Sequence, residues 1–192
     1  MDSQFGTPKV MPENDKITRL RSNDLTAWEL LVHEHYDAVF RLLRHLSRSA
    51  DDAEDLTQQT FVKAHTRIDG FRNDSAIKTW LFKIAYHEFT NWNRRRRLFF
   101  PLNLALQRRE AGYDKTDAGE LLLSAIHGMK AELRNAFLLC EVNGLTMEEI
   151  AEVTNSPVGS VKSRVHHARM QLRTYWEQNV QEQKYEPRQS EI

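Results

Sequence analysis

The chain has 192 residues, 40% of them hydrophobic, so it can form one ordinary domain or two small ones with real cores. Its 27 Lys and Arg residues balance its 27 Asp and Glu residues, so net charge does not indicate a nucleic-acid partner. The single cysteine, Cys140, excludes an intramolecular disulfide, and its apolar neighbours predict a buried side chain. The chain shows neither a membrane-spanning segment nor a signal peptide, so we expect a cytoplasmic protein.

The N-terminal end is predicted to be a loose tail followed by a helical domain over residues 15–98. Residues 1–14 contain glycine and prolines among mixed polar residues, which is typical of a disordered terminus. Over residues 15–48 apolar side chains recur at spacings of three and four, which predicts helix. Asn23 or Asp24 is suited to cap the longer part of it.

A second helix is predicted to begin at Ser49 or Asp51, with acidic residues in its first turn where the helix dipole favours them. Its outward face is rich in carboxylates and amides. Such a face is either simply solvated or a partner-binding surface, and we favour the second interpretation for the following residues: Asp52, Asp55, Gln58 and Gln59.

A loop at residues 69–75 leads into a third predicted helix over about 75–98. This helix has a wide apolar stripe and ends in the basic run Arg94–Arg97. Aromatic rings followed by arginines suit single-stranded nucleic acid, because bases stack on rings while arginines hold the backbone. Rings at helical spacing are more often core than stacking platforms, and this is the expected role of Trp80, Phe82 and Phe89.

The second half of the chain is predicted to be a separate helical domain. Residues 99–117 lose periodicity and contain proline and glycine, which indicates a flexible linker. Helical spacing returns over 118–177, interrupted by Asn143-Gly144, where glycine can take a left-handed cap conformation. Residues 178–192 are polar and are predicted to form a tail.

The stretch from Leu145 to Arg169 predicts a helix-turn-helix. Thr146 and Glu149 have the spacing of a capping box at the start of a short helix. Pro157 ends that helix and begins the next, with Ser156 as the expected N-cap.

The second helix of this motif carries a buried stripe and a cationic outer face. The stripe is predicted from the spacing of Val161, Val165, Ala168, Leu172 and Trp176. A short helix, a tight turn and a basic second helix suit the major groove of DNA, although a solvated charged face is the plainer alternative.

The sequence contains no motif of a known catalytic chemistry. It lacks a P-loop, a dinucleotide-binding glycine motif, a nucleophile elbow and a zinc-protease motif. The pairs His33/His35 and His166/His167 do not have the i, i+4 spacing that places two metal ligands on one helix face. We therefore expect no enzymatic activity and no cofactor.

Three stretches together resemble the sigma-70 family of bacterial RNA polymerase sigma factors, and specifically its small extracytoplasmic-function (ECF) group. Residues 52–64 resemble region 2.2, residues 71–97 resemble regions 2.3 and 2.4, and residues 144–169 resemble region 4. A helix-turn-helix alone is weak evidence, but its combination with the acidic helix and the tryptophan-containing helix is specific.

The resemblance implies three binding surfaces and three partners: core RNA polymerase (the clamp of its largest subunit and its flap), promoter DNA and an anti-sigma factor. The acidic and amide face of the second helix would bind the clamp. The melted strand of the −10 element would be bound by Phe71, Arg72, Asn73, Lys78, Trp80, His87, Asn91, Arg94, Arg95, Arg96 and Arg97. The −35 element would be bound by Ser156, Ser160, Lys162, Ser163, Arg164, His166 and His167.

Four positions depart from the family pattern. His87 stands where Asn is usual and Asn91 where Asp is common, which bears on the −10 preference. Ser160 replaces a usual Thr and His167 a frequent Arg, which bears on the −35 contacts.

The sequence thus predicts an all-α protein of two small helical domains joined by a flexible linker, with a C-terminal helix-turn-helix. We expect it to direct promoter-specific initiation of transcription. Two other functions are compatible with the same predicted fold. The protein could be a free-standing helix-turn-helix regulator that acts as a homodimer, or an adaptor that binds polymerase without recognising promoters.

Overall fold

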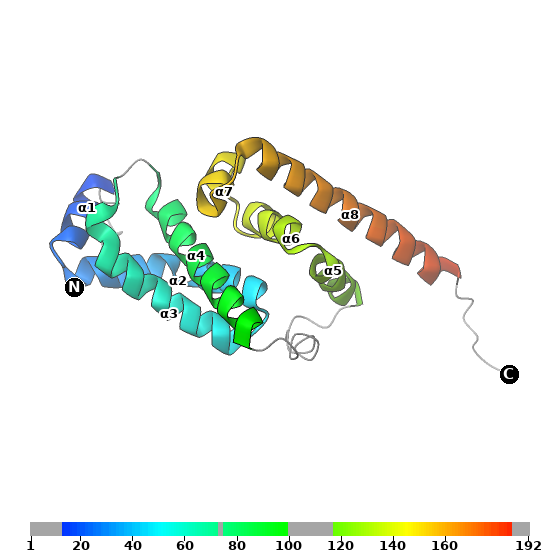
Figure 1. Cartoon of the computed structure of the whole chain (residues 1–192), viewed down its shortest axis with the longest axis horizontal. Coiled ribbons are helices and arrows are strands. Elements are labelled where there is room, and N and C mark those ends of the chain that lie inside the picture. Colours follow the sequence, from blue (N-terminus) through cyan, green and yellow to red (C-terminus); the bar gives the residue numbers. More distant parts are fainter. Residues whose placement is uncertain (1–12, 73–74, 100–116, 186–192) are drawn as a thin grey trace, which may run out of the picture.

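The computed structural model describes residues 13–72, 75–99 and 117–185, and these parts of the chain form helices without any strand (Figure 1). The predicted all-α class is therefore confirmed. The expected N-terminal tail and the linker lie almost entirely outside the described residues.

Four α-helices form the N-terminal half: α1 (Glu13–Arg21), α2 (Leu25–Ser47), α3 (Ala50–Arg67) and, after the short 3-10 helix η1 (Ile68–Gly70), α4 (Ile77–Phe99). Asn23 has a left-handed φ of 59° and divides the helical pattern of residues 15–48 into two helices. The Asp24 carboxylate accepts hydrogen bonds from the backbone N–H groups of Thr26 and Ala27, so the cap that begins α2 is Asp24.

The core of this half is built where α2, α3 and α4 face one another. Leu31, Val39 and Leu43 of α2 are completely buried. Phe82 and Phe89 of α4 are 1% and 4% exposed, which confirms that these rings are core side chains. Trp80, for which the same role was expected, is only half-buried and packs at the edge of the core.

The C-terminal half contains α5 (Asp117–Gly128), α6 (Ala131–Phe137), the π-helical turn η3 (Leu138–Val142), α7 (Met147–Thr154) and α8 (Val158–Tyr185). Gly144 has φ +66°, as expected for a left-handed residue after a helix. The π turn was not predicted. Helix α8 also continues to Tyr185, so the predicted tail begins too early, because Gln, Glu and Lys after Trp176 are good helix formers.

The helix-turn-helix has the predicted capping box, with hydrogen bonds from Thr146 N to Glu149 Oε2 (2.8 Å) and from Glu149 N to Thr146 Oγ1 (3.2 Å). Asn155 ends α7 in a left-handed conformation (φ 49°). The expected N-cap role of Ser156 is wrong. The Pro157 carbonyl accepts the first N–H groups of α8, while the Ser156 hydroxyl donates to the Thr154 carbonyl.

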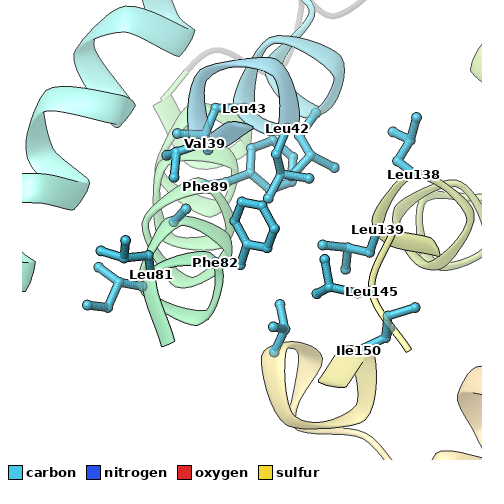
Figure 2. Packing of buried hydrophobic residues seen from close by; sticks show 14 of the residues in the cluster. Val39, Leu42, Leu43, Leu81, Phe82, Phe89, Leu138, Leu139, Leu145 and Ile150 are labelled. Carbon is cyan, nitrogen blue, oxygen red and sulfur yellow. The ribbon is translucent and has the colours of Figure 1, made fainter. Parts of the chain in front are cut away.

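The two halves pack against each other through apolar side chains. Figure 2 shows Phe82 of α4 pointing toward Leu139 and Leu145 of the second half, all of them at most 4% exposed. Cys140, which was expected to be buried, is only half-buried, with its sulfur 3.9 Å from Arg169 Nη2. The core is therefore continuous across both halves.

Candidate nucleic-acid and partner interfaces

The outer face of α3 presents most of the acidic and amide side chains that were expected there. Asp55, Gln58 and Gln59 are exposed, and the opposite face is closed by Thr57 and Thr60, whose buried hydroxyls donate to backbone carbonyls one turn back at 2.7 Å. The helix that presents this exposed face therefore has both of these threonine hydroxyls hydrogen-bonded on its buried side.

Asp52, the fourth residue of that predicted surface, has different contacts. Its carboxylate pairs with the Arg96 guanidinium of α4 at 3.3 Å, and Arg96 in turn lies over the Trp92 ring at 5.0 Å from its centre. The two charged side chains are only 30% and 20% exposed. This pair fastens the C-terminal part of α4 to the start of α3.

One side of α4 carries a row of linked polar side chains. Asn91 Nδ2 donates to His87 Nδ1 at 3.1 Å, and the Arg94 guanidinium donates to Asn91 Oδ1 at 3.4 Å. His87, Arg94 and Arg95 are exposed. The two departures at 87 and 91 therefore form one unit with an arginine, and this unit faces solvent.

A pocket of about 450 Å³ lies at the N-terminal end of α4. Trp80 packs on Phe71 with ring centres 5.1 Å apart, and Phe71 itself is 2% exposed. The pocket is bordered by basic and polar side chains with one carboxylate among them: Arg67, Arg72, Ser75, Lys83, His87 and Glu152. An aromatic wall with cations around it suits a base and its phosphates.

The predicted −10 residues thus have different surroundings, and Trp80 and Asn91 among them are half-buried. Arg72, Lys78, His87, Arg94 and Arg95 are exposed, whereas Phe71 is buried and supports Trp80. Arg96 is engaged with Asp52. Asn73 and the side chain of Arg97 lie outside the described residues.

The outer face of α8 presents several of the predicted −35 residues at its N-terminal end. Lys162, Ser163 and His166 are exposed at spacings that place them on one side of the helix, opposite the buried Val161 and Val165. The predicted stripe ends earlier than expected, because Trp176 is 47% exposed.

The remaining members of that set have different surroundings. Arg164 is half-buried and donates to the hydroxyl of the half-buried Ser156 at 3.0 Å, which ties the turn to the helix. Ser160, in the first turn of α8, is half-buried as well. His167 borders a separate pocket shared with Lys130 next to α6. Arg164 therefore positions the motif, while His167 lies on its flank.

Side chains from the two halves also meet in a set of polar contacts that the sequence did not indicate. Thr79 Oγ1 donates to Glu149 Oε1 at 2.7 Å, and Ser75 Oγ and Lys83 Nζ donate to Glu152 Oε1 at 3.2 and 3.4 Å. The backbone N–H of Thr146, with help from the Thr79 hydroxyl, holds the pKa of Glu149 below its usual range despite partial burial. Thr79 and Glu149 are 70 residues apart in the chain, and such pairs leave no local signal.

Within the described ranges, no three His, Cys, Asp or Glu side chains are grouped so that they could hold a metal ion. None of the helices in these ranges combines the length and apolar character needed to cross a membrane.

Comparison with protein families finds two matches that cover most of the described chain. Residues 31–99 match sigma-70 region 2, and residues 119–172 match sigma-70 region 4. The first match spans α2 to α4, and the second spans α5 to the middle of α8.

Individual relatives agree with these matches. The ECF RNA polymerase sigma-E factor of Haemophilus influenzae is 34% identical over 80% of this chain and 89% of its own length. The ECF RNA polymerase sigma factor SigE of Mycolicibacterium smegmatis is 32% identical over 79% of this chain, and the match spans 62% of that longer relative.

Two solved structures have the same arrangement of helices. The sigma factor RpoE of Bartonella quintana, determined with the anti-sigma factor NepR, is 28% identical, with a TM-score of 0.64 over 78% of this chain and 96% of that one. CnrH, determined with the cytosolic domain of CnrY, shares the fold at 23% identity, with a TM-score of 0.65 over 84% of this chain and 95% of that one. From its helices, its matches to both sigma regions and its relatives, this chain belongs to the ECF group of the sigma-70 family of RNA polymerase sigma factors.

Proposed function

We propose that this protein is a promoter-specificity subunit that binds core RNA polymerase and directs initiation of transcription at its own set of promoters. The observation that carries the proposal is the exposed cationic face of α8 in a chain that also matches region 2. The protein supplies recognition and no catalysis, and it acts in the cytoplasm, where core polymerase and DNA are found.

Each surface binds a different partner. Asp55, Gln58 and Gln59 on α3 bind the polymerase clamp, and the pocket beside Trp80 takes a base of the melted −10 strand. The exposed residues near the start of α8 enter the major groove at the −35 element: Lys162, Ser163 and His166. An anti-sigma factor is a further partner, by analogy with the Bartonella protein.

The test is to mix the purified chain with bacterial core polymerase, isolate the complex by size exclusion and transcribe a pool of promoter fragments. A complex that yields specific transcripts is expected. A stable homodimer that binds DNA but not core polymerase would instead support the free-standing regulator.

Paired variants test the division of surfaces. Lys162→Ala with Ser163→Ala should reduce transcription from −35-dependent promoters about tenfold or more while polymerase affinity stays at the wild-type value, since lost base and phosphate contacts cost about 1–3 kcal/mol. Asp55→Ala with Gln59→Ala should weaken polymerase binding instead. Equal loss of polymerase affinity in both pairs would contradict the division.

A further inference from the structure

The N-terminal helix α1 is bonded to the backbone at the edge of the pocket beside Trp80. Arg21, the last residue of α1, donates from its guanidinium to the backbone carbonyl of Phe71, 50 residues further along the chain. Phe71 and its neighbour Arg72 both border the pocket. Helix α1 thus reaches the segment that forms one wall of the pocket.

Phe71 is held at three points, and Arg21 supplies one of them. Phe71 is 2% exposed, and its ring packs on Trp80 with the ring centres 5.1 Å apart. Its backbone N–H donates to the Ile68 carbonyl at 3.1 Å, at the end of the 3-10 helix η1. These two contacts fix the ring and the N-terminal side of the residue, whereas its carbonyl, which leads to Arg72, is bonded to Arg21. The direction in which the chain continues along the pocket therefore depends on Arg21.

Helix α1 is itself fastened to α2, so its last residue donates from a fixed support. Leu20 is 1% exposed, and the indole N–H of Trp28 in α2 donates to the Leu20 carbonyl at 3.1 Å. The Lys16 ammonium pairs with the Glu34 carboxylate of α2. A guanidinium on a fixed helix restrains the carbonyl that it binds, because hydrogen bonds from charged donors are among the stronger ones in proteins.

The contact joins two parts of the chain with different standing in the family comparison. The match to sigma-70 region 2 begins at residue 31, so α1 precedes it, whereas Phe71 lies within it. A helix outside the matched region therefore restrains a segment inside it.

We infer that Arg21 is a positioning residue for the pocket beside Trp80 and that it sharpens the selection among DNA bases there. A site discriminates between ligands only while its walls hold within about 0.5 Å of the best geometry. Arg21 keeps the backbone of Phe71 and Arg72 in place next to Trp80, and it acts through the Phe71 carbonyl rather than by contact with the base. This inference rests on the proposed function.

The test measures base discrimination by the full-length chain in complex with core polymerase. The template is a promoter that the wild-type chain transcribes from the fragment pool, with each position of its −10 and −35 elements replaced in turn by the other three bases. The readout is the ratio of run-off transcripts between the best base and the others at each position. Because this ratio does not depend on how much active protein is present, a variant that is merely less stable would leave it unchanged.

Arg21→Ala is expected to lower the ratio about fivefold or more at one position of the −10 element. This loss is smaller than the full strength of a charge-assisted hydrogen bond, because Arg21 is exposed. The ratios at the −35 element should stay at the wild-type value, since Arg21 has no contact with α8 that would transmit a change.

Lys16→Ala is the matched control, because it removes a positive charge and a contact with α2 from the same helix. It should change no ratio by more than about twofold. Wild-type ratios in Arg21→Ala, or an equal loss in Arg21→Ala and Lys16→Ala, would overturn the positioning role.

Amide hydrogen exchange tests the restraint without polymerase. In the free chain, peptides that contain residues 70–72 should exchange about fivefold or more faster in Arg21→Ala, because their backbone loses the same hydrogen bond. Lys16→Ala should leave their exchange at the wild-type rate. Unchanged exchange in Arg21→Ala would overturn the inference.

The two measurements separate this inference from the proposed function. Specific transcripts from the wild-type chain, together with wild-type base ratios in Arg21→Ala, would reject the positioning role and leave the sigma function intact. Absence of a polymerase complex would reject the function itself, and with it the role assigned to Arg21.

Discussion

Among individual side chains, the neighbouring Arg95 and Arg96 have opposite surroundings. Arg96 is paired with Asp52 and lies over Trp92, whereas Arg95 is exposed. Helical geometry explains the difference, because adjacent residues are about 100° apart around the axis and only one of them can face α3. The arginine run therefore does not provide four equivalent phosphate contacts.

Arg96→Gln and Arg95→Gln should consequently have unequal effects. Arg96→Gln should lower the free energy of unfolding by about 0.5–1 kcal/mol, since it removes a partly buried ion pair and a cation–π contact. Arg95→Gln should leave stability unchanged and weaken DNA binding. Urea denaturation of both variants is the measurement, and equal stabilities would contradict a structural role for Arg96.

Among the helices and their ends, the features that could be predicted are those set by residues close together in the sequence. The Asp24 cap, the capping box of α7 and the left-handed Gly144 each depend on a few neighbouring residues. The π turn at Leu138–Val142 and the extension of α8 to Tyr185 were not predicted. A π turn depends on how α6 packs, and helix-forming polar residues look the same in a tail as in a helix.

The capping box offers a prediction for the helix-turn-helix. Thr146→Ala should lower the free energy of unfolding by about 1 kcal/mol, because the Glu149 N–H loses its acceptor. Thr146→Ser keeps the hydroxyl and should stay within a few tenths of a kcal/mol of the wild type. Thermal or urea unfolding followed by circular dichroism distinguishes the two, and an equal loss in both variants would contradict the cap.

Across the complete fold, two helical domains and two DNA-facing helices were expected from the sequence. The contacts through which the two halves meet were not predicted. Pairs such as Thr79–Glu149 and Lys83–Glu152 join residues far apart in the chain. No periodicity or motif encodes such pairs, because each residue alone resembles an ordinary polar side chain on a helix. The aromatic and basic residues around the candidate −10 pocket were therefore singled out from the sequence, whereas the Glu152 carboxylate that borders it was not.

A second contact between the halves predicts a pH dependence. Arg48 donates to the His127 backbone carbonyl at 3.1 Å, and burial, together with the positive charges of Arg48, Arg134 and His45, lowers the pKa of His127 to about 4 from its usual 6.5. Between these values the unfolded chain binds a proton that the folded chain does not. The His127 contribution to stability is complete above pH 6.5 and is lost as the pH drops toward 4.

Protonation of His127 should lower the free energy of unfolding by about 1–2 kcal/mol as the pH drops from 6.5 to 4. This figure is reduced for the partial exposure of the ring. Urea denaturation of the wild type and of His127→Gln across this range is the measurement. The variant should lose less stability than the wild type, although other histidines still contribute. An identical loss in both proteins would contradict the assignment.

Cys140 has a practical consequence for measuring the distance between the two halves in solution. Burial, with the nearby Glu141 charge, raises the pKa of its thiol, and thiol-reactive dyes attack through the thiolate. The native cysteine should consequently label slowly, and it is the only one in the chain. Cysteines introduced at exposed positions of α3 and α8 could then carry a donor and an acceptor dye, so that energy transfer reports the separation between them in an otherwise native protein.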